Sequence, residues 1–110
     1  LLVWRSFMHP GEWGNGSQWS EDQAVFLVQK FLPLDGLFNP NVVLQIKTGP
    51  FDFQVHEPVQ SLFGSIVHTP LVMEVEMSQT FTGQGRHLVH LPVQWASYLA
   101  FDTERNKSPP

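Results

Sequence analysis

Short runs of apolar side chains divide the sequence into elements. Residues 1–5 and 42–47 are almost continuously apolar, and each run ends in a cation, Arg5 or Lys47. Such runs are typical of strands that are buried on both faces of a parallel sheet. Residues 71–77 instead place Leu71, Met73, Val75 and Met77 on one face and the acidic Glu74 and Glu76 on the other, which predicts a third strand with two different faces. We expect the three strands to be parallel neighbours.

An apolar pattern with the period of an α-helix lies between the first two predicted strands. Residues 20–32 place apolar side chains on one face of a helix. Ser20 and Gln23 form a capping box at its start, and Pro33 and Gly36 predict its end. We expect this helix to pack on the outside of the sheet.

The order of the elements is that of an α/β protein. A second helix is expected over residues 92–100, and residues 106–110 form a polar tail that we expect to be disordered or truncated. Strand, helix and strand follow one another at the spacing of β–α units. The sequence therefore predicts a single α/β unit over residues 1–105.

Composition excludes several classes of function. The 110 residues carry a formal net charge of −4 with only six Lys and Arg, so the chain lacks the basic surface of a nucleic-acid-binding protein. The absence of cysteine excludes disulfides and thiolate metal sites. His87 and His90 are three residues apart, but no third metal ligand accompanies them. We expect no metal, no cofactor and no membrane-spanning segment.

The chain begins with leucine, inside an apolar run. Natural domains rarely begin within a strand, so we expect a fragment of a longer protein. The run reaches Arg5 after four residues, which is too short for the apolar core of a signal peptide. No targeting segment is visible, so we expect a soluble fragment and leave its compartment open.

Arg5 and Lys47 stand at the ends of two predicted strands. In a (β/α) barrel the carboxyl ends of the strands form the active face. Two cations at that face would suit an anionic ligand. Taken singly, each cation also fits a surface charge, and the pattern leaves that alternative open.

The segment that follows the second strand carries a distinctive set of residues. A strand ending in Lys47 is followed by Gly49-Pro50 and then by Asp52-Phe53. This segment resembles the signature of family 67 α-glucuronidases. Further segments agree with that family in order and spacing: Trp4-Arg5-Ser6-Phe7, Pro33-Leu34-Asp35-Gly36, Leu62-Phe63-Gly64, Thr82-Gly83-Gln84, His87-Leu88-Val89 and Phe101-Asp102-Thr103.

The resemblance implies a fold and a reaction. The fold would be a (β/α)8 TIM barrel, to which residues 1–105 contribute about three β–α units and the rest of the parent chain the remainder. The reaction would be the removal, with inversion, of (4-O-methyl-)glucuronic acid from glucuronoxylan oligosaccharides, without a cofactor. Inversion requires a general acid and a general base on opposite faces of the sugar.

The resemblance also implies roles for three residues. Arg5 and Lys47 match basic residues that bind the uronic carboxylate, and Arg suits this role because it can donate two parallel hydrogen bonds to a carboxylate. Asp52 matches a carboxylate on the side of the attacking water, which makes it the candidate general base. Judged without the resemblance, Asp52 also fits a turn cap after Gly49-Pro50, and that alternative stays open.

Two departures from the family pattern bear on activity. The general acid of the family lies upstream of the first residue of this chain. A second catalytic glutamate of the family is replaced by Thr80, whose hydroxyl cannot act as a base at neutral pH. Glu76 shares a face with Thr80 but lies too far along the strand to substitute for the glutamate. The alternative function is an impaired relative that binds uronic-acid sugars without cleaving them, and a third is an unrelated α/β domain without a site.

Overall fold

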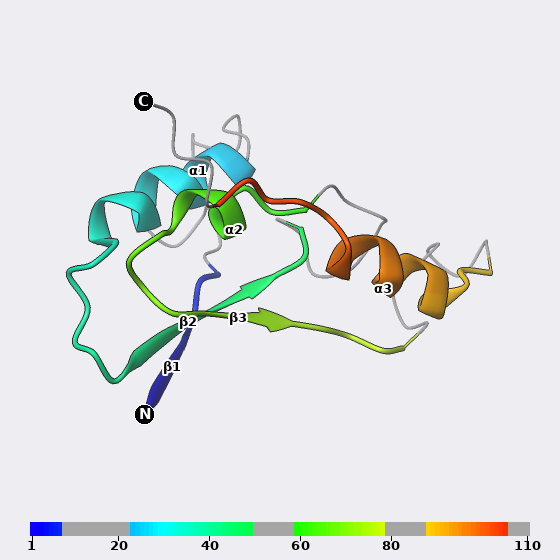
Figure 1. Ribbon diagram of the computed structural model, residues 1–110, viewed down its shortest axis with the longest axis horizontal. Helices are drawn as coiled ribbons and strands as arrows, with labels where there is room; N and C mark the ends of the chain where they lie inside the picture. The colour runs from blue at the N-terminus through cyan, green and yellow to red at the C-terminus, as the bar shows by residue number, and fades with distance from the viewer. Residues whose placement is uncertain (8–22, 50–58, 79–87, 106–110) are drawn as a thin grey trace, which may run out of the picture.

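The described residues are built on a three-stranded parallel sheet (Figure 1). The computed structural model describes residues 1–7, 23–49, 59–78 and 88–105. Strands β1 (Leu2–Arg5), β2 (Val42–Lys47) and β3 (Leu71–Glu74) lie in chain order, and β2 pairs in parallel with both of its neighbours. The predicted α/β class and the parallel arrangement of the three strands are confirmed.

Strand β3 is shorter than the predicted strand over residues 71–77, because its partner ends first. The last residue pair in the ladder joins Lys47 of β2 to Glu74 of β3. Beyond Lys47 the chain bends at Thr48 and Gly49, so the backbone after Glu74 has no neighbouring strand in the described residues. The alternating pattern therefore continues past the point where hydrogen-bonded pairing stops.

In the described part of the chain, three α-helices accompany the sheet. Helix α1 (Gln23–Phe31) is followed by a turn of 3₁₀ helix, η1 (Leu32–Leu34), and the chain then turns at Gly36 with a φ of 77°, so the predicted end of this helix is confirmed. The predicted capping Ser20 lies outside the described residues. Helix α3 (Leu91–Leu99) confirms the helix expected over residues 92–100. The short helix α2 (Leu62–Ser65) was not predicted.

One face of β2 forms the core with the helices. Helices α1 and α2 lie on the same side of the sheet (Figure 1). The buried side chains of this core are Leu27, Phe31, Leu44, Ile46, Leu62 and Ile66. Burying one such side chain stabilises the fold by roughly 1.5–3 kcal/mol. Trp4 of β1 extends the same layer through edge-to-face contacts with the rings of Phe31 and Phe38. The predicted packing of α1 outside the sheet is confirmed.

The opposite face of the sheet changes character along its strands. Side chains at alternate positions share a face, so Val3 and Val72 belong to this second face, and both are nearly half exposed. Further toward the carboxyl ends of the strands, the same face carries polar and charged side chains. These are Arg5, Gln45, Lys47 and Glu74.

A network of hydrogen bonds holds the loop before β3. The carboxylate of Asp35 accepts hydrogen bonds from the backbone N–H groups of Val67, His68 and Thr69, at N–O distances of 2.8–3.1 Å. Arg105, which follows α3, also binds this loop: its Nη2 donates to the carbonyl oxygens of Val67 and Thr69 at 3.3 Å. Because this loop leads directly into β3, the network sets where that strand begins.

Among the helices that the structure describes, none is both long and apolar enough to cross a membrane. The predicted tail over residues 106–110 lies outside the described residues, so the boundary at residue 105 stays a prediction.

Candidate functional site

Polar side chains from all three strands meet at the carboxyl end of the sheet. In the ladder, Arg5 of β1 lies beside Gln45 of β2, and Lys47 of β2 lies beside Glu74 of β3. All four side chains occupy the sheet face opposite α1 and α2. The parallel register of the strands therefore creates a charged cluster from residues that are far apart in the sequence.

Arg5 and Glu74 form a two-pronged ion pair in this cluster. Arg5 Nε lies 2.7 Å from Glu74 Oε2, and Arg5 Nη2 lies 2.7 Å from Glu74 Oε1. Gln45 Nε2 also donates to Glu74 Oε2, at 2.7 Å. These hydrogen bonds, led by those from Arg5, lower the pKa of the Glu74 carboxyl from its ordinary value against the opposing effect of partial burial. Glu74 is therefore ionised at neutral pH.

Both cations of the cluster contact one aromatic ring, that of Phe7, just after β1. Lys47 Nζ lies 3.7 Å from the ring centroid, and Arg5 Cζ lies 4.8 Å from it. The side chain of Lys47 is nearly inaccessible, with 2% of its surface exposed. A ring face attracts a cation electrostatically, and the nearby Glu74 carboxylate also compensates the charge of Lys47. The two cations are thus placed together at one edge of the sheet.

The sequence-predicted site residues divide into two groups. The structure brings Arg5 and Lys47 together, as expected from their positions at strand ends, although a role in binding a ligand stays a prediction. Asp52 and Thr80 lie outside the described residues, so their expected convergence with the cations also stays a prediction.

Sequence reasoning missed two members of the cluster. The pattern places Glu74 on the polar face of the third strand but does not predict its pairing with Arg5, and it marks Gln45 only as part of a strand. The available signal was the matching alternation of Arg5, Gln45 and Glu74 on neighbouring strands. The described residues contain no group of three or more His, Cys, Asp or Glu side chains that could hold a metal ion.

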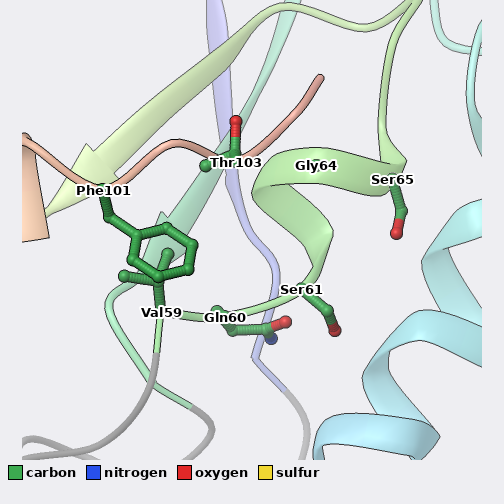
Figure 2. Close-up of a pocket in the computed structure, with 7 residues that line it drawn as sticks. All are labelled: Val59, Gln60, Ser61, Gly64, Ser65, Phe101 and Thr103. Atoms are coloured by element: carbon green, nitrogen blue, oxygen red, sulfur yellow. The ribbon is translucent and has the colours of Figure 1, made fainter. Parts of the chain in front are cut away.

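A separate cavity of about 250 Å³ lies between α2 and the segment that follows α3. Figure 2 shows Phe101 beside Val59 on one side of this cavity, and Gly64 and Thr103 on another. A Cβ atom on Gly64 would lie 2.5 Å from the carbonyl oxygen of Thr103, so only glycine allows this close approach. Among the described residues, none that lines the cavity is charged, and these residues distinguish no ligand class.

Parallel α/β proteins bind their ligands at the carboxyl ends of the strands. The sheet therefore defines a parallel α/β unit, and its charged cluster lies at the edge where proteins of this class bind their ligands. The sequence then identifies the family, because residues 1–109 match the family model of the "Glycosyl hydrolase family 67 middle domain". The chain belongs to glycosyl hydrolase family 67.

Several curated relatives support this assignment over nearly the whole chain. "Probable alpha-glucuronidase A" of Aspergillus niger is 44% identical over 109 residues, which are 99% of this chain. "Alpha-glucuronidase A" of Aspergillus tubingensis is 43% identical over the same share. "Alpha-glucuronidase" of Hypocrea jecorina is 42% identical over 106 residues, or 96% of this chain. The chain spans only 12–13% of the length of these relatives.

Proposed function

We propose that this chain is part of the catalytic barrel of an inverting α-glucuronidase that removes (4-O-methyl-)glucuronic acid from glucuronoxylan oligosaccharides. The observation that carries the proposal is the placement of Arg5 and Lys47 against the same ring at the carboxyl edge of the sheet. The names of the relatives support the reaction class. In this proposal both cations bind the uronic carboxylate.

The chemistry of the cluster suits a single carboxylate. Arg5 and Lys47 carry two positive charges, and Glu74 carries one negative charge. Within the described residues, positive charge thus exceeds negative charge in the cluster, which favours an anionic ligand such as a carboxylate. A hydrogen bond between ionised partners is stronger than one between neutral groups, and each such contact contributes roughly 1.5–3 kcal/mol. The cluster would thus hold the sugar by a group that takes no part in bond cleavage.

Cleavage in this proposal relies on Asp52 as the general base. An inverting enzyme activates a water on the face of the sugar opposite to the leaving oxygen. Asp52 follows the end of β2 by five residues, which suits a loop on the active face. The general acid comes from another part of the protein, as the family resemblance implies.

The strand order supports the barrel as the complete fold. A (β/α)8 barrel contains eight parallel strands that neighbour one another in chain order, with the helices on their outer face. The described residues supply three such strands and two helices on that face. We propose that the rest of the protein closes the sheet.

A second candidate function is an impaired relative that binds uronic-acid sugars without cleaving them. Thr80 favours it, because this position carries a catalytic glutamate in the family pattern. A threonine hydroxyl can hydrogen-bond a water but cannot accept its proton at neutral pH. With Asp52 alone on the water side, we expect hydrolysis to be weakened by up to the factor of about 10²–10⁴ that general-base catalysis supplies.

Turnover of an aldouronic acid by the complete protein tests the proposal. We expect Thr80→Glu to raise turnover and Asp52→Ala to abolish it. Lys47→Ala should mainly weaken binding, because it removes a charge contact remote from the scissile bond. Lys30→Ala is the matched control, since Lys30 lies over the ring of Phe26 on α1, away from the cluster.

The same measurements separate the two functions. A wild-type protein that binds glucuronic acid without turnover, together with a Thr80→Glu variant that gains turnover, would favour the impaired relative. If neither protein binds a uronic acid, both functions are wrong and the resemblance extends to the fold alone.

A further inference from the structure

We infer that Glu74 is a positioning residue for the uronate site, which holds the guanidinium of Arg5 in the orientation that meets the sugar carboxylate. The inference rests on the proposed function and adds a residue to its binding machinery. The observation behind it is the pair of 2.7 Å contacts between the carboxylate of Glu74 and two nitrogens of Arg5.

The geometry of a guanidinium explains how one carboxylate can orient it for another. Arginine donates from a planar group whose two edges can each form two parallel hydrogen bonds. Glu74 engages the edge formed by Nε and Nη2 of Arg5. Because the group is rigid and planar, this contact fixes the direction of the second edge, formed by Nη1 and Nη2. A ligand carboxylate bound along that second edge would meet a group that is already oriented.

Glu74 is itself held from the neighbouring strand. Gln45 Nε2 donates to Glu74 Oε2 at 2.7 Å, so this oxygen receives hydrogen bonds from both Gln45 and Arg5. Each of the three strands thus contributes one side chain to the network, and the ladder sets their spacing. The carboxylate of Glu74 is only partly exposed, with 18% of its side-chain surface accessible. The orientation of Arg5 therefore depends on the register of the sheet.

Replacing Glu74 by glutamine would have two opposing effects on anion binding. The local charge would become more positive, which attracts any anion. Arg5 would also lose its orientation, because an amide offers one oxygen acceptor where the carboxylate offers two and its NH2 group repels the donors of Arg5. Salt screens the first effect, since the Arg5 side chain is 40% exposed, but it does not restore the orientation. At physiological salt the loss of orientation dominates.

The test measures the dissociation constant of glucuronic acid with the complete protein by titration calorimetry. At ionic strength near 0.15 M we expect Glu74→Gln to weaken binding about tenfold, in line with the loss of one charge-assisted contact. Binding by this variant should also depend more steeply on salt than binding by the wild type. Glu76→Gln is the matched control, because Glu76 accepts a hydrogen bond from Ser78 and not from a cation of the cluster. This control should bind within about twofold of the wild type.

A double-mutant cycle shows whether Glu74 acts through Arg5. In an Arg5→Ala background, Glu74→Gln should change the dissociation constant less than about twofold, because the group that it orients is gone. A residue that only stabilised the fold would weaken binding equally in both backgrounds. An equal loss in both backgrounds would therefore overturn the inference.

A second variant keeps the inference testable if Glu74→Gln does not fold. Gln45→Met removes one donor to Glu74 but leaves all three charges, and we expect it to weaken glucuronic acid binding about threefold. If the folded variants of Glu74 and Gln45 bind as tightly as the wild type, the inference alone is wrong. If the wild-type protein does not bind glucuronic acid, the proposed function is wrong and the inference falls with it.

Discussion

Lys47 is held in place by the fold itself, which suits the carboxylate-binding role that we propose for it. The Lys47 side chain is only 2% exposed, and burying its ammonium group destabilises the fold unless nearby groups compensate the positive charge. The ring of Phe7 and the negative charge of Glu74 both act on Lys47. A side chain that is confined in the folded protein loses little freedom when a ligand binds, so less of the binding energy is spent on ordering it.

Asp35 provides a test at the scale of one residue. Partial burial acts to raise its pKa, but hydrogen bonds from the backbone of Val67, His68 and Thr69 lower it to about 2, against an ordinary value of 3.8. Since the folded pKa lies below the unfolded one, the carboxylate contributes stability above about pH 4 that is lost as the pH falls toward 2. The loop before β3 should loosen over the same range.

Asp35→Asn should weaken this loop even at neutral pH, because an amide NH2 group cannot accept hydrogen bonds. We expect the local free energy of opening to fall by about 1 kcal/mol, after allowing for solvent screening of a partly exposed group. Hydrogen exchange of the amides of residues 67–69 in the complete protein measures this change. In the variant, opening should no longer depend on pH between 4 and 2.

The control for this measurement is Asp102→Asn, since Asp102 accepts a hydrogen bond from the backbone of Glu104 rather than from residues 67–69. Unchanged exchange at residues 67–69 in Asp35→Asn would contradict the role assigned to this carboxylate.

Part of the charged cluster could be predicted from single residues and part could not. The sequence predicts Arg5 and Lys47 because each ends an apolar run, which marks the end of a strand. The expectation that both strands are buried is correct for β2 but wrong for β1, whose four residues are exposed within the described structure. The pair between Arg5 and Glu74 depends on the register of strands that are far apart in the chain. The continuous apolar run of residues 1–4 has no alternation that would specify this register. The roles of Asp52 and Thr80 rest on the family resemblance and stay predictions.

At the scale of elements, prediction succeeded where the pattern was long or uniform. The run of residues 42–47 matches β2 at both ends, because its apolar side chains are buried at the centre of the sheet. The predicted end of α1 matches because proline and glycine act through backbone geometry alone. Helix α2 was missed because four residues with a central glycine carry no helical period.

Gly64→Ala tests the contact between α2 and the segment after α3. Alanine favours a helix over glycine by up to about 1 kcal/mol. The added Cβ would, however, lie 2.5 Å from the backbone oxygen of Thr103, which cannot rotate away as a side chain would. We expect the clash to dominate and to destabilise the protein by roughly 1–3 kcal/mol. The midpoint of thermal unfolding of the complete protein should fall, and the amides of residues 101–105 should exchange faster.

Ser65→Ala is the control for this prediction, because Ser65 is the next residue of α2 and lines the same cavity. It should leave both measurements unchanged. A Gly64→Ala variant as stable as the wild type would show that the segment around Thr103 can move aside at little cost.

At the scale of the whole molecule, the described sheet leaves apolar surface uncovered. Within the described residues, β1 and β3 each pair with a strand on one side only. Leu2, Val3, Trp4 and Val72 on these strands are all more than 40% exposed. Unpaired strand edges and exposed apolar faces promote association between chains. Three strands establish the α/β class, but they are too few to distinguish a closed barrel from an open sheet.

We therefore expect the isolated 110-residue chain to aggregate or to fold only in part. Size-exclusion chromatography and thermal unfolding followed by circular dichroism test this expectation. A monomer with a sharp, cooperative unfolding transition would contradict it. The longer parent protein serves as the control, because the rest of its chain is expected to cover these edges.

The pairing of the strands also sets the order in which the sheet can form during synthesis. Leu2 pairs with Val42, and Leu44 pairs with Leu71. A parallel pair cannot close through a tight turn, so β1 must wait for β2 until about forty further residues have been made. At about 5–20 residues per second the wait lasts roughly 2–8 s. During that interval the edge of β1 that β2 later covers stays unpaired, which makes the emerging chain a candidate client for chaperones at the ribosome.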